Sequence, residues 1–224
     1  MAELSALRDA RTLGEFNMAS ADTVVYKGKS IRTGDMSDSA DIVRAQHVQE
    51  TLKRLGIPPW AWRVNATLAA LGTSAGTPAG AFGLTPGTHG SATPIIVGES
   101  ASGNSKTNVM RTQVQIPWEY DPGESCVLRV MARVTANCNT SQSLDLSVYL
   151  SDEEAGIDGS DLYAGAVVAL STTFDELSFA LSPATLTPGA WLDLLLTGLA
   201  DDTGGSAGSV IQIAETSLLL DIRG

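Results

Sequence analysis

Strict alternation of apolar and polar residues in the C-terminal half constrains this chain more than any other feature. Between residues 125 and 138 every second side chain is apolar, whereas Arg129 and Arg133 fall on the opposite parity. A period of two is typical of a strand with one buried face. The residues predicted to face inward are Cys126, Leu128, Val130, Ala132, Val134, Ala136 and Cys138. We therefore predict one long half-buried strand here.

Six further segments have strand character and no helical segment intervenes between them. Their approximate ranges are 109–116, 144–150, 162–170, 177–181, 192–196 and 209–222. Pro-Gly turns are predicted at 121–123 and 187–189 because Pro and Gly suit tight turns. Seven strands at this spacing predict a mainly β protein whose residues 109–224 form an antiparallel, jelly-roll-like β-sandwich.

The last predicted strand changes parity along its length. Ile211 and Ile213 occupy odd positions, whereas Leu218, Leu220 and Ile222 occupy even ones. One extra residue in the strand would return both sets to one buried face. We therefore predict a β-bulge near Glu215.

The N-terminal part is predicted to be an extended arm with one helix. Residues 1–37 are weakly patterned, with an arm or short hairpin expected around residues 23–31. Residues 38–55 repeat apolar side chains at steps of three and four and are followed by Gly56 and two prolines, which predicts a helix. We expect the anchoring segment 38–71 to attach the protein to a partner through Ile42, Val48, Leu52, Trp60 and Trp62.

Residues 72–108 are rich in Gly, Ser, Thr, Ala and Pro and contain one short predicted strand, 95–97. A structureless loop of this length is uncommon inside a compact domain. The segment is therefore predicted to be a linker or a loop that packs against other subunits.

Charge and hydropathy exclude several classes of function. The net charge is −11, with 14 basic and 25 acidic residues. This balance argues against nucleic acid and against an anionic membrane surface as partners. No stretch has 18 apolar residues and the first 25 residues do not resemble a signal peptide, so we expect synthesis in a host cytoplasm.

The cysteines are predicted to be buried thiols rather than a disulfide. Cys126 and Cys138 fall on one face of the same predicted strand, which would separate them by roughly 40 Å. A disulfide tolerates only about 4.4–6.8 Å between the Cα atoms.

No motif in the sequence indicates catalysis or a cofactor. The chain has two histidines, His47 and His89, and neither lies in a nucleophile, zinc or phosphate-binding motif. Paired carboxylates in the acidic loops could serve a glycosidase, but the predicted strands offer few aromatic walls for a groove. We expect a protein that is not an enzyme.

Two weaker site hypotheses remain open. Clustered loop carboxylates could bind Ca²⁺ or could simply be solvated; the candidates are Asp152, Asp158, Asp161, Asp201 and Asp202. Trp118 and Tyr120 precede a Pro-Gly turn and either pack a strand end or contact a carbohydrate. Trp60 and Trp62 either anchor a core or an interface or form a platform on which a sugar stacks.

Four segments resemble structural proteins of tailed-bacteriophage virions. They are YKGKSIRTGDM (26–36), LGIPPWAWRV (55–64), IPWEYDPGESCVLRV (116–130) and LTPGAWLDLLLTG (186–198). The resemblance implies a capsid decoration protein, head fibre, tail fibre or baseplate component, located in the virion and attached through its N-terminal region. It also implies a homo-oligomer, by analogy a trimer, that contacts the major capsid or other virion proteins. The alternative is a carbohydrate-binding β-sandwich of a tail fibre, baseplate or similar adhesion module, with surface carbohydrate as its partner.

Overall fold

The computed structural model describes residues 23–26, 29–32, 51–151 and 156–222. The chain divides into two compact units, and the second spans Thr51–Arg223. In the first unit, β1 (Thr23–Tyr26) and β2 (Lys29–Arg32) pair as an antiparallel hairpin. This agrees with the hairpin expected around residues 23–31.

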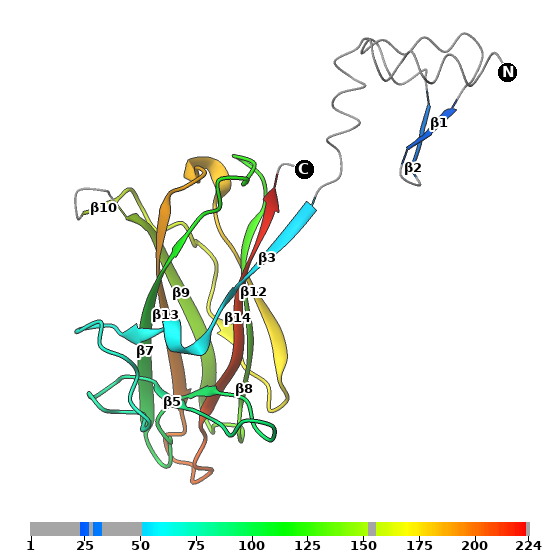
Figure 1. Cartoon of the computed structure of the whole chain (residues 1–224). Coiled ribbons are helices and arrows are strands. Elements are labelled where there is room, and N and C mark those ends of the chain that lie inside the picture. The colour runs from blue at the N-terminus through cyan, green and yellow to red at the C-terminus, as the bar shows by residue number, and fades with distance from the viewer. Residues whose placement is uncertain (1–22, 27–28, 33–50, 152–155, 223–224) are drawn as a thin grey trace, which may run out of the picture. The chain divides into compact units, whose positions relative to one another are not determined.

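Two antiparallel sheets form the second unit (Figure 1). The first sheet has the order β10-β9-β13-β7-β4, with β11 also paired to β9. Its strands are β4 (Arg63–Val64), β7 (Ser105–Gln115), β9 (Ser141–Ser151), β10 (Ile157–Asp158), β11 (Val168–Ala169) and β13 (Trp191–Asp201). The second sheet has the order β12-β8-β14-β6-β5, with β3 also paired to β14. Its strands are β3 (Thr51–Ile57), β5 (Gly83–Thr85), β6 (Ile95–Val97), β8 (Cys126–Val134), β12 (Asp175–Ala180) and β14 (Ile211–Ile222).

The long strands alternate between the two sheets along the chain. β7, β9 and β13 belong to the first sheet, and β8, β12 and β14 belong to the second. Each connection between consecutive long strands therefore crosses the end of the sandwich, which places the inner faces of both sheets against one core. The prediction of a mainly β, antiparallel sandwich is confirmed.

Side-chain parity decides which residues form that core. β8 alternates buried and half-buried residues along its whole length, as the sequence predicts for Leu128 to Val134. The inward residues of β7, β13 and β12 are also buried, as predicted; among them are Met110, Leu192, Leu194, Leu196 and Phe179. Ile116, which follows β7, is buried too.

The two cysteines do not lie on one strand, so the prediction of a single long strand over residues 125–138 is wrong. β8 ends at Val134, and the chain then turns before the half-buried Cys138. Both thiols are free, and Cys126 alone is buried. The apolar parity continues past Val134, but pairing with β12 ends at Ala132 and pairing with β14 ends at Val134.

The predicted bulge and both predicted turns are confirmed. The register between β14 and β8 shifts between Ile213 and Glu215. Gly123 and Gly189 have φ values of 88° and 82°, which glycine adopts without strain. Each closes a turn whose last amide donates to the first carbonyl, Glu124 to Asp121 and Ala190 to Thr187.

Two predicted elements are wrong where the structure describes them. Residues 51–55, the end of the predicted helix, lie in β3, which pairs with β14 from Thr216 to Ile222. A free sheet edge outweighs the weak helical periodicity of this segment. The rest of that helix, with Ile42 and Val48, lies outside the described residues. Of the predicted strand 162–170, only β11 is a strand, and the rest of the segment is irregular chain.

The Gly-rich segment 72–108 packs on its own sandwich. Strand β6 matches the predicted strand 95–97, and Phe82, Ile96 and Ala101 are fully buried in the core. Asn108 is buried as well and holds the segment together by accepting from the Glu99 amide and donating to Ala81 O. The compact unit therefore begins at Thr51, ahead of the predicted boundary at residue 109.

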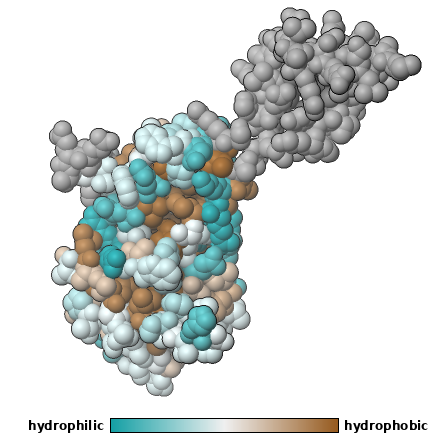
Figure 2. Space-filling view, in the orientation of Figure 1, coloured by the Kyte–Doolittle hydropathy of each residue, from teal (hydrophilic) through white to brown (hydrophobic). Residues whose placement is uncertain are grey.

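The segment β3–η2–β4 runs across one open edge of the sandwich, with η2 spanning Pro59–Ala61. Figures 1 and 2 view this edge, and apolar residues are visible between β3 and β7. Within the described residues, no helix is both long and apolar enough to cross a membrane.

Candidate functional site

The outer face of the first sheet carries exposed aromatic, amide and charged side chains. Along β13 the even-numbered residues point into the core, so Trp191, Asp193 and Leu195 belong to the outer face. Register places each of them between one residue of β7 and one of β9. The three rows are Gln115–Trp191–Ser151, Gln113–Asp193–Tyr149 and Arg111–Leu195–Ser147.

Two tryptophans lie near Gly189 at one end of this face. The ring of Trp118 lies against Gly189, where an added Cβ would come within 2.6 Å of the indole. Gly189 is two residues before Trp191, and its carbonyl accepts a hydrogen bond from Gln115 Nε2 at 3.0 Å. Gln115 is in turn the cross-strand neighbour of Trp191. We call Trp118, Trp191, Gln115 and Gly189 the Trp118–Trp191 surface.

Both indoles of this surface are open to solvent. Trp118 is 75% exposed and Trp191 is 46% exposed. Large aromatic side chains are usually buried or used at contacts, because an exposed ring leaves much apolar area in water. The Trp118–Trp191 surface therefore has the properties of a contact surface.

An ion pair connects the next two rows along the sheet. Arg111 donates through Nε to Asp193 Oδ1 at 2.6 Å and through Nη2 to Oδ2, which makes the pair bidentate. Asp193 is buried although it points outward. Hydrogen bonding to Asp193 raises the pKa of Arg111, against the opposing effect of burial. The pair is a rigid, planar group of donors and acceptors.

This combination of groups suits binding rather than bond cleavage. The exposed rings offer flat apolar faces, and Gln113, Gln115 and the Arg111–Asp193 pair offer directional hydrogen bonds. Both oxygens of Asp193 are engaged by Arg111. A carboxylate held in this way is poorly suited to act as a general acid or base.

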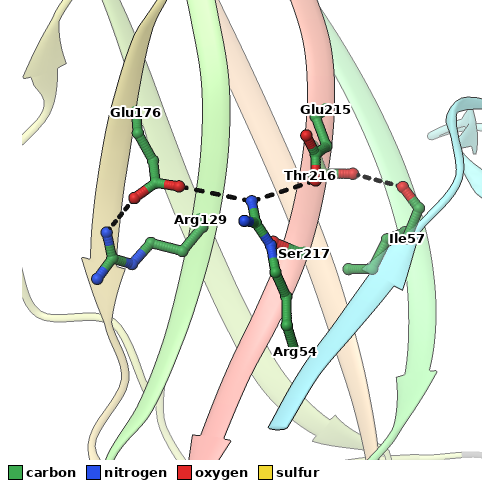
Figure 3. Close-up of polar contacts among 7 residues, drawn as sticks. All are labelled: Arg54, Ile57, Arg129, Glu176, Glu215, Thr216 and Ser217. Carbon is green, nitrogen blue, oxygen red and sulfur yellow. Dashed lines mark hydrogen bonds and ion pairs between the residues drawn. The ribbon is translucent and has the colours of Figure 1, made fainter. Parts of the chain in front are cut away.

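The outer face of the second sheet carries a different polar network (Figure 3). Glu176 accepts from both Arg129 and Arg54, and Arg54 also pairs with Glu215 and donates to Ser217 Oγ. These contacts connect β3 to β14, β8 and β12. Because they are partly exposed and balanced in charge, they stabilise the sheet only slightly.

The predicted aromatic residues separate into exposed and buried pairs. Trp60 is 62% exposed, whereas Trp62 is completely buried and donates from Nε1 to Thr216 Oγ1 at 2.9 Å. The 3-10 turn η2 breaks the strand parity that these two indoles would otherwise share. Tyr120 is also buried, with its hydroxyl donating to Glu124 O, which corrects its assignment as a ligand contact. Of the predicted anchors, Leu52 is 59% exposed on β3.

Three of the acidic calcium candidates accept hydrogen bonds from nearby groups of the protein. Asp161 accepts from the amides of Val148 and Tyr163, and Asp202 accepts from those of Asn139 and Ala207. Asp201 accepts from the amide and hydroxyl of Thr203. Asp158 lies in β10, and Asp152 is outside the described residues. In the described ranges no three acidic, histidine or cysteine side chains gather as a metal site.

Sequence reasoning missed Trp191 and the Arg111–Asp193 pair as members of a site. The parity of β13 already placed Trp191 and Asp193 on the outward face, because Leu192 and Leu194 point inward. The neighbours contributed by β7 could not be predicted, since the pairing of strands distant in sequence depends on the tertiary fold.

No family model matches the chain, and no curated protein matches it. Among solved structures, it is similar to the enzymatically active domain of tailspike protein 4 of bacteriophage CBA120, with 15% identity and a TM-score of 0.38. That match covers 76% of this chain and 19% of the tailspike chain, so the chain spans about a fifth of its length.

Two carbohydrate-binding modules are also similar. The CBM22-1 xylan-binding domain from Paenibacillus barcinonensis has 13% identity and a TM-score of 0.34, with 64% of this chain and 82% of that chain covered. TmCBM61, solved with β-1,4-galactotriose, has 11% identity and a TM-score of 0.36, with 79% and 93% covered. At these values the likeness concerns the β-sandwich alone.

Proposed function

We propose that this protein is a non-catalytic carbohydrate-binding β-sandwich that contacts saccharides with the outer face of its first sheet. The observation that carries the proposal is the Trp118–Trp191 surface. There, the exposed indole of Trp118 lies over Gly189, two residues before the exposed indole of Trp191, and Gln115 lies beside both.

The chemistry of this face matches the chemistry of a sugar ring. A pyranose has apolar C–H faces and a rim of hydroxyl groups. The indoles can cover the C–H faces, and amide, carboxylate and guanidinium groups can bond the rim. Binding sites commonly combine an aromatic wall with a few well-placed polar groups in this way.

The arrangement of carboxylates supports binding over hydrolysis. Glycosidases place two carboxyl groups about 5–9.5 Å apart on either side of the bond that is cleaved. On this face Asp193 is paired with Arg111, and Asp145 lies opposite Thr197, four residues further along β13. Four residues correspond to about 13 Å along a strand, so these two carboxylates do not form such a pair.

The test is a screen of the full chain on an array of microbial glycans, followed by titration of the bound glycans. We expect Trp191→Ala and Trp118→Ala each to weaken binding at least tenfold, about 1.4 kcal/mol. Trp118→Phe should retain most of the affinity because it keeps a ring over Gly189. Binding that survives both alanine substitutions, or no bound glycan at all, would contradict the proposal.

A second proposed function is attachment to a phage virion through residues before Thr51. It is supported by the division of the chain, because Thr51–Arg223 is a compact unit without those residues. The attached unit would then present the Trp118–Trp191 surface. Light scattering should find the full chain as an oligomer and the Thr51–Arg223 fragment as a monomer. A full chain that is monomeric and absent from particles produced in its presence would rule this out.

A further inference from the structure

Arg63 lies on the same outer face as the Arg111–Asp193 pair. Strand β4 pairs with β7 so that Arg63 is opposite Arg111 and Val64 is opposite Met110. Val64 and Met110 are both buried, so the two arginines share the outward parity. Arg63 therefore extends the row Arg111–Leu195–Ser147 by one strand.

Arg63 is not neutralised by any side chain that the structure describes. It is half-buried, and within the described ranges no hydrogen bond or ion pair reaches its guanidinium group. The nearest carboxylate of the sheet, Asp193, already binds Arg111 with both oxygens. Asp145 belongs to β9, three strand spacings or about 14 Å from β4, beyond a Debye length in physiological salt.

The two guanidinium groups should therefore oppose each other unless an anion joins them. Like charges at directly opposed positions of an antiparallel pair are destabilising. Asp193 compensates one of the two positive charges and leaves one in excess. This excess stands out because the chain as a whole carries a net charge of −11.

We propose that Arg63 binds the carboxylate of an acidic saccharide, whose next sugar units extend along the sheet toward the Trp118–Trp191 surface. This rests on the proposed carbohydrate binding and adds the ligand class, a carboxylate-bearing glycan. A guanidinium group binds a carboxylate with two parallel hydrogen bonds. Trp191 and Leu195 are four residues apart on β13, so about 13 Å separates the aromatic end from the arginine row. Such a span suits an oligosaccharide rather than a single sugar.

The experiment compares carboxylate-bearing and neutral glycans on the same array with the full chain. We expect the bound glycans to carry a carboxylate, and Arg63→Gln to weaken their binding at least tenfold. Arg133→Gln is the matched control, because it removes the same charge from the second sheet and should leave binding unchanged. Reducing the glycan carboxylate to an alcohol should lower the affinity of the native chain to that of Arg63→Gln.

The outcomes separate this inference from the proposed function. Binding only to neutral glycans, with the tryptophan variants impaired, would overturn the role of Arg63 and leave carbohydrate binding intact. Equal losses in Arg63→Gln and Arg133→Gln would show general electrostatics and also overturn it. Binding to no glycan by a folded chain would overturn both proposals. The native fold of each variant is checked by circular dichroism.

Discussion

Thr216 is the centre of a buried hydrogen-bond relay. It accepts from Trp62 Nε1 at 2.9 Å and donates to Ile57 O at 2.8 Å (Figure 3 shows the second contact). Thr216→Val keeps the volume but leaves the indole N–H and the carbonyl unpaired. We expect a loss of about 1–3 kcal/mol in the free energy of unfolding, measured in urea. Thr197→Val, on the outer face of β13, should change it by less than about 0.5 kcal/mol.

Cys126 should make the protein less stable in alkali. Burial raises the pKa of its thiol from 9.0 to about 12, so the folded state keeps this proton up to a higher pH than the unfolded state does. The unfolded chain therefore loses the proton first, and stability falls as the pH rises from about 9 to about 12.

Urea unfolding at several pH values checks this expectation. The slope of stability against pH should be shallower in Cys126→Ala than in the native chain, whatever the stability of that variant at neutral pH. Tyr120, whose pKa burial raises to about 12, maintains part of the slope in both proteins. Identical slopes in the two proteins would refute the role of Cys126.

At the scale of elements, the bulge in β14 tests how register controls the core. Ile213 pairs with Ala132 and Glu215 pairs with Met131, which leaves Ala214 as the extra residue. Deleting Ala214 should therefore give a continuous ladder with the same residues inward, and the protein should still fold. Deleting Ser217 should turn Leu218 and Leu220 outward and prevent folding. Near-UV circular dichroism and thermal melting distinguish the two deletions, and equal tolerance of both would contradict this account.

At the scale of the molecule, Thr51–Arg223 should be an autonomous folding unit. All of the core residues identified above lie within it. We expect this fragment to unfold in one cooperative transition and to bind the same glycans as the full chain with an affinity within threefold. A fragment that folds but no longer binds would place part of the binding surface before Thr51.

Local pattern was sufficient to predict several features of the sandwich. The inward faces of β7, β8, β12, β13 and β14, the bulge near Glu215 and the two Pro-Gly turns all follow from side-chain parity and turn chemistry. In a strand buried on one face, apolar and polar residues alternate, so the inward face can be predicted from neighbouring residues alone.

The remaining features of the fold depend on contacts between residues that are distant in the sequence. Residues 51–55 become a strand because β14 offers them an edge, and the Gly-rich segment 72–108 is ordered because Phe82 and Ile96 enter the core. The alternation of leucines along β13 was enough to predict that Trp191 faces outward from its strand. Only the fold decided that Trp118, Arg111 and Arg63 share its surface, because cross-strand register brings together residues that no local pattern relates.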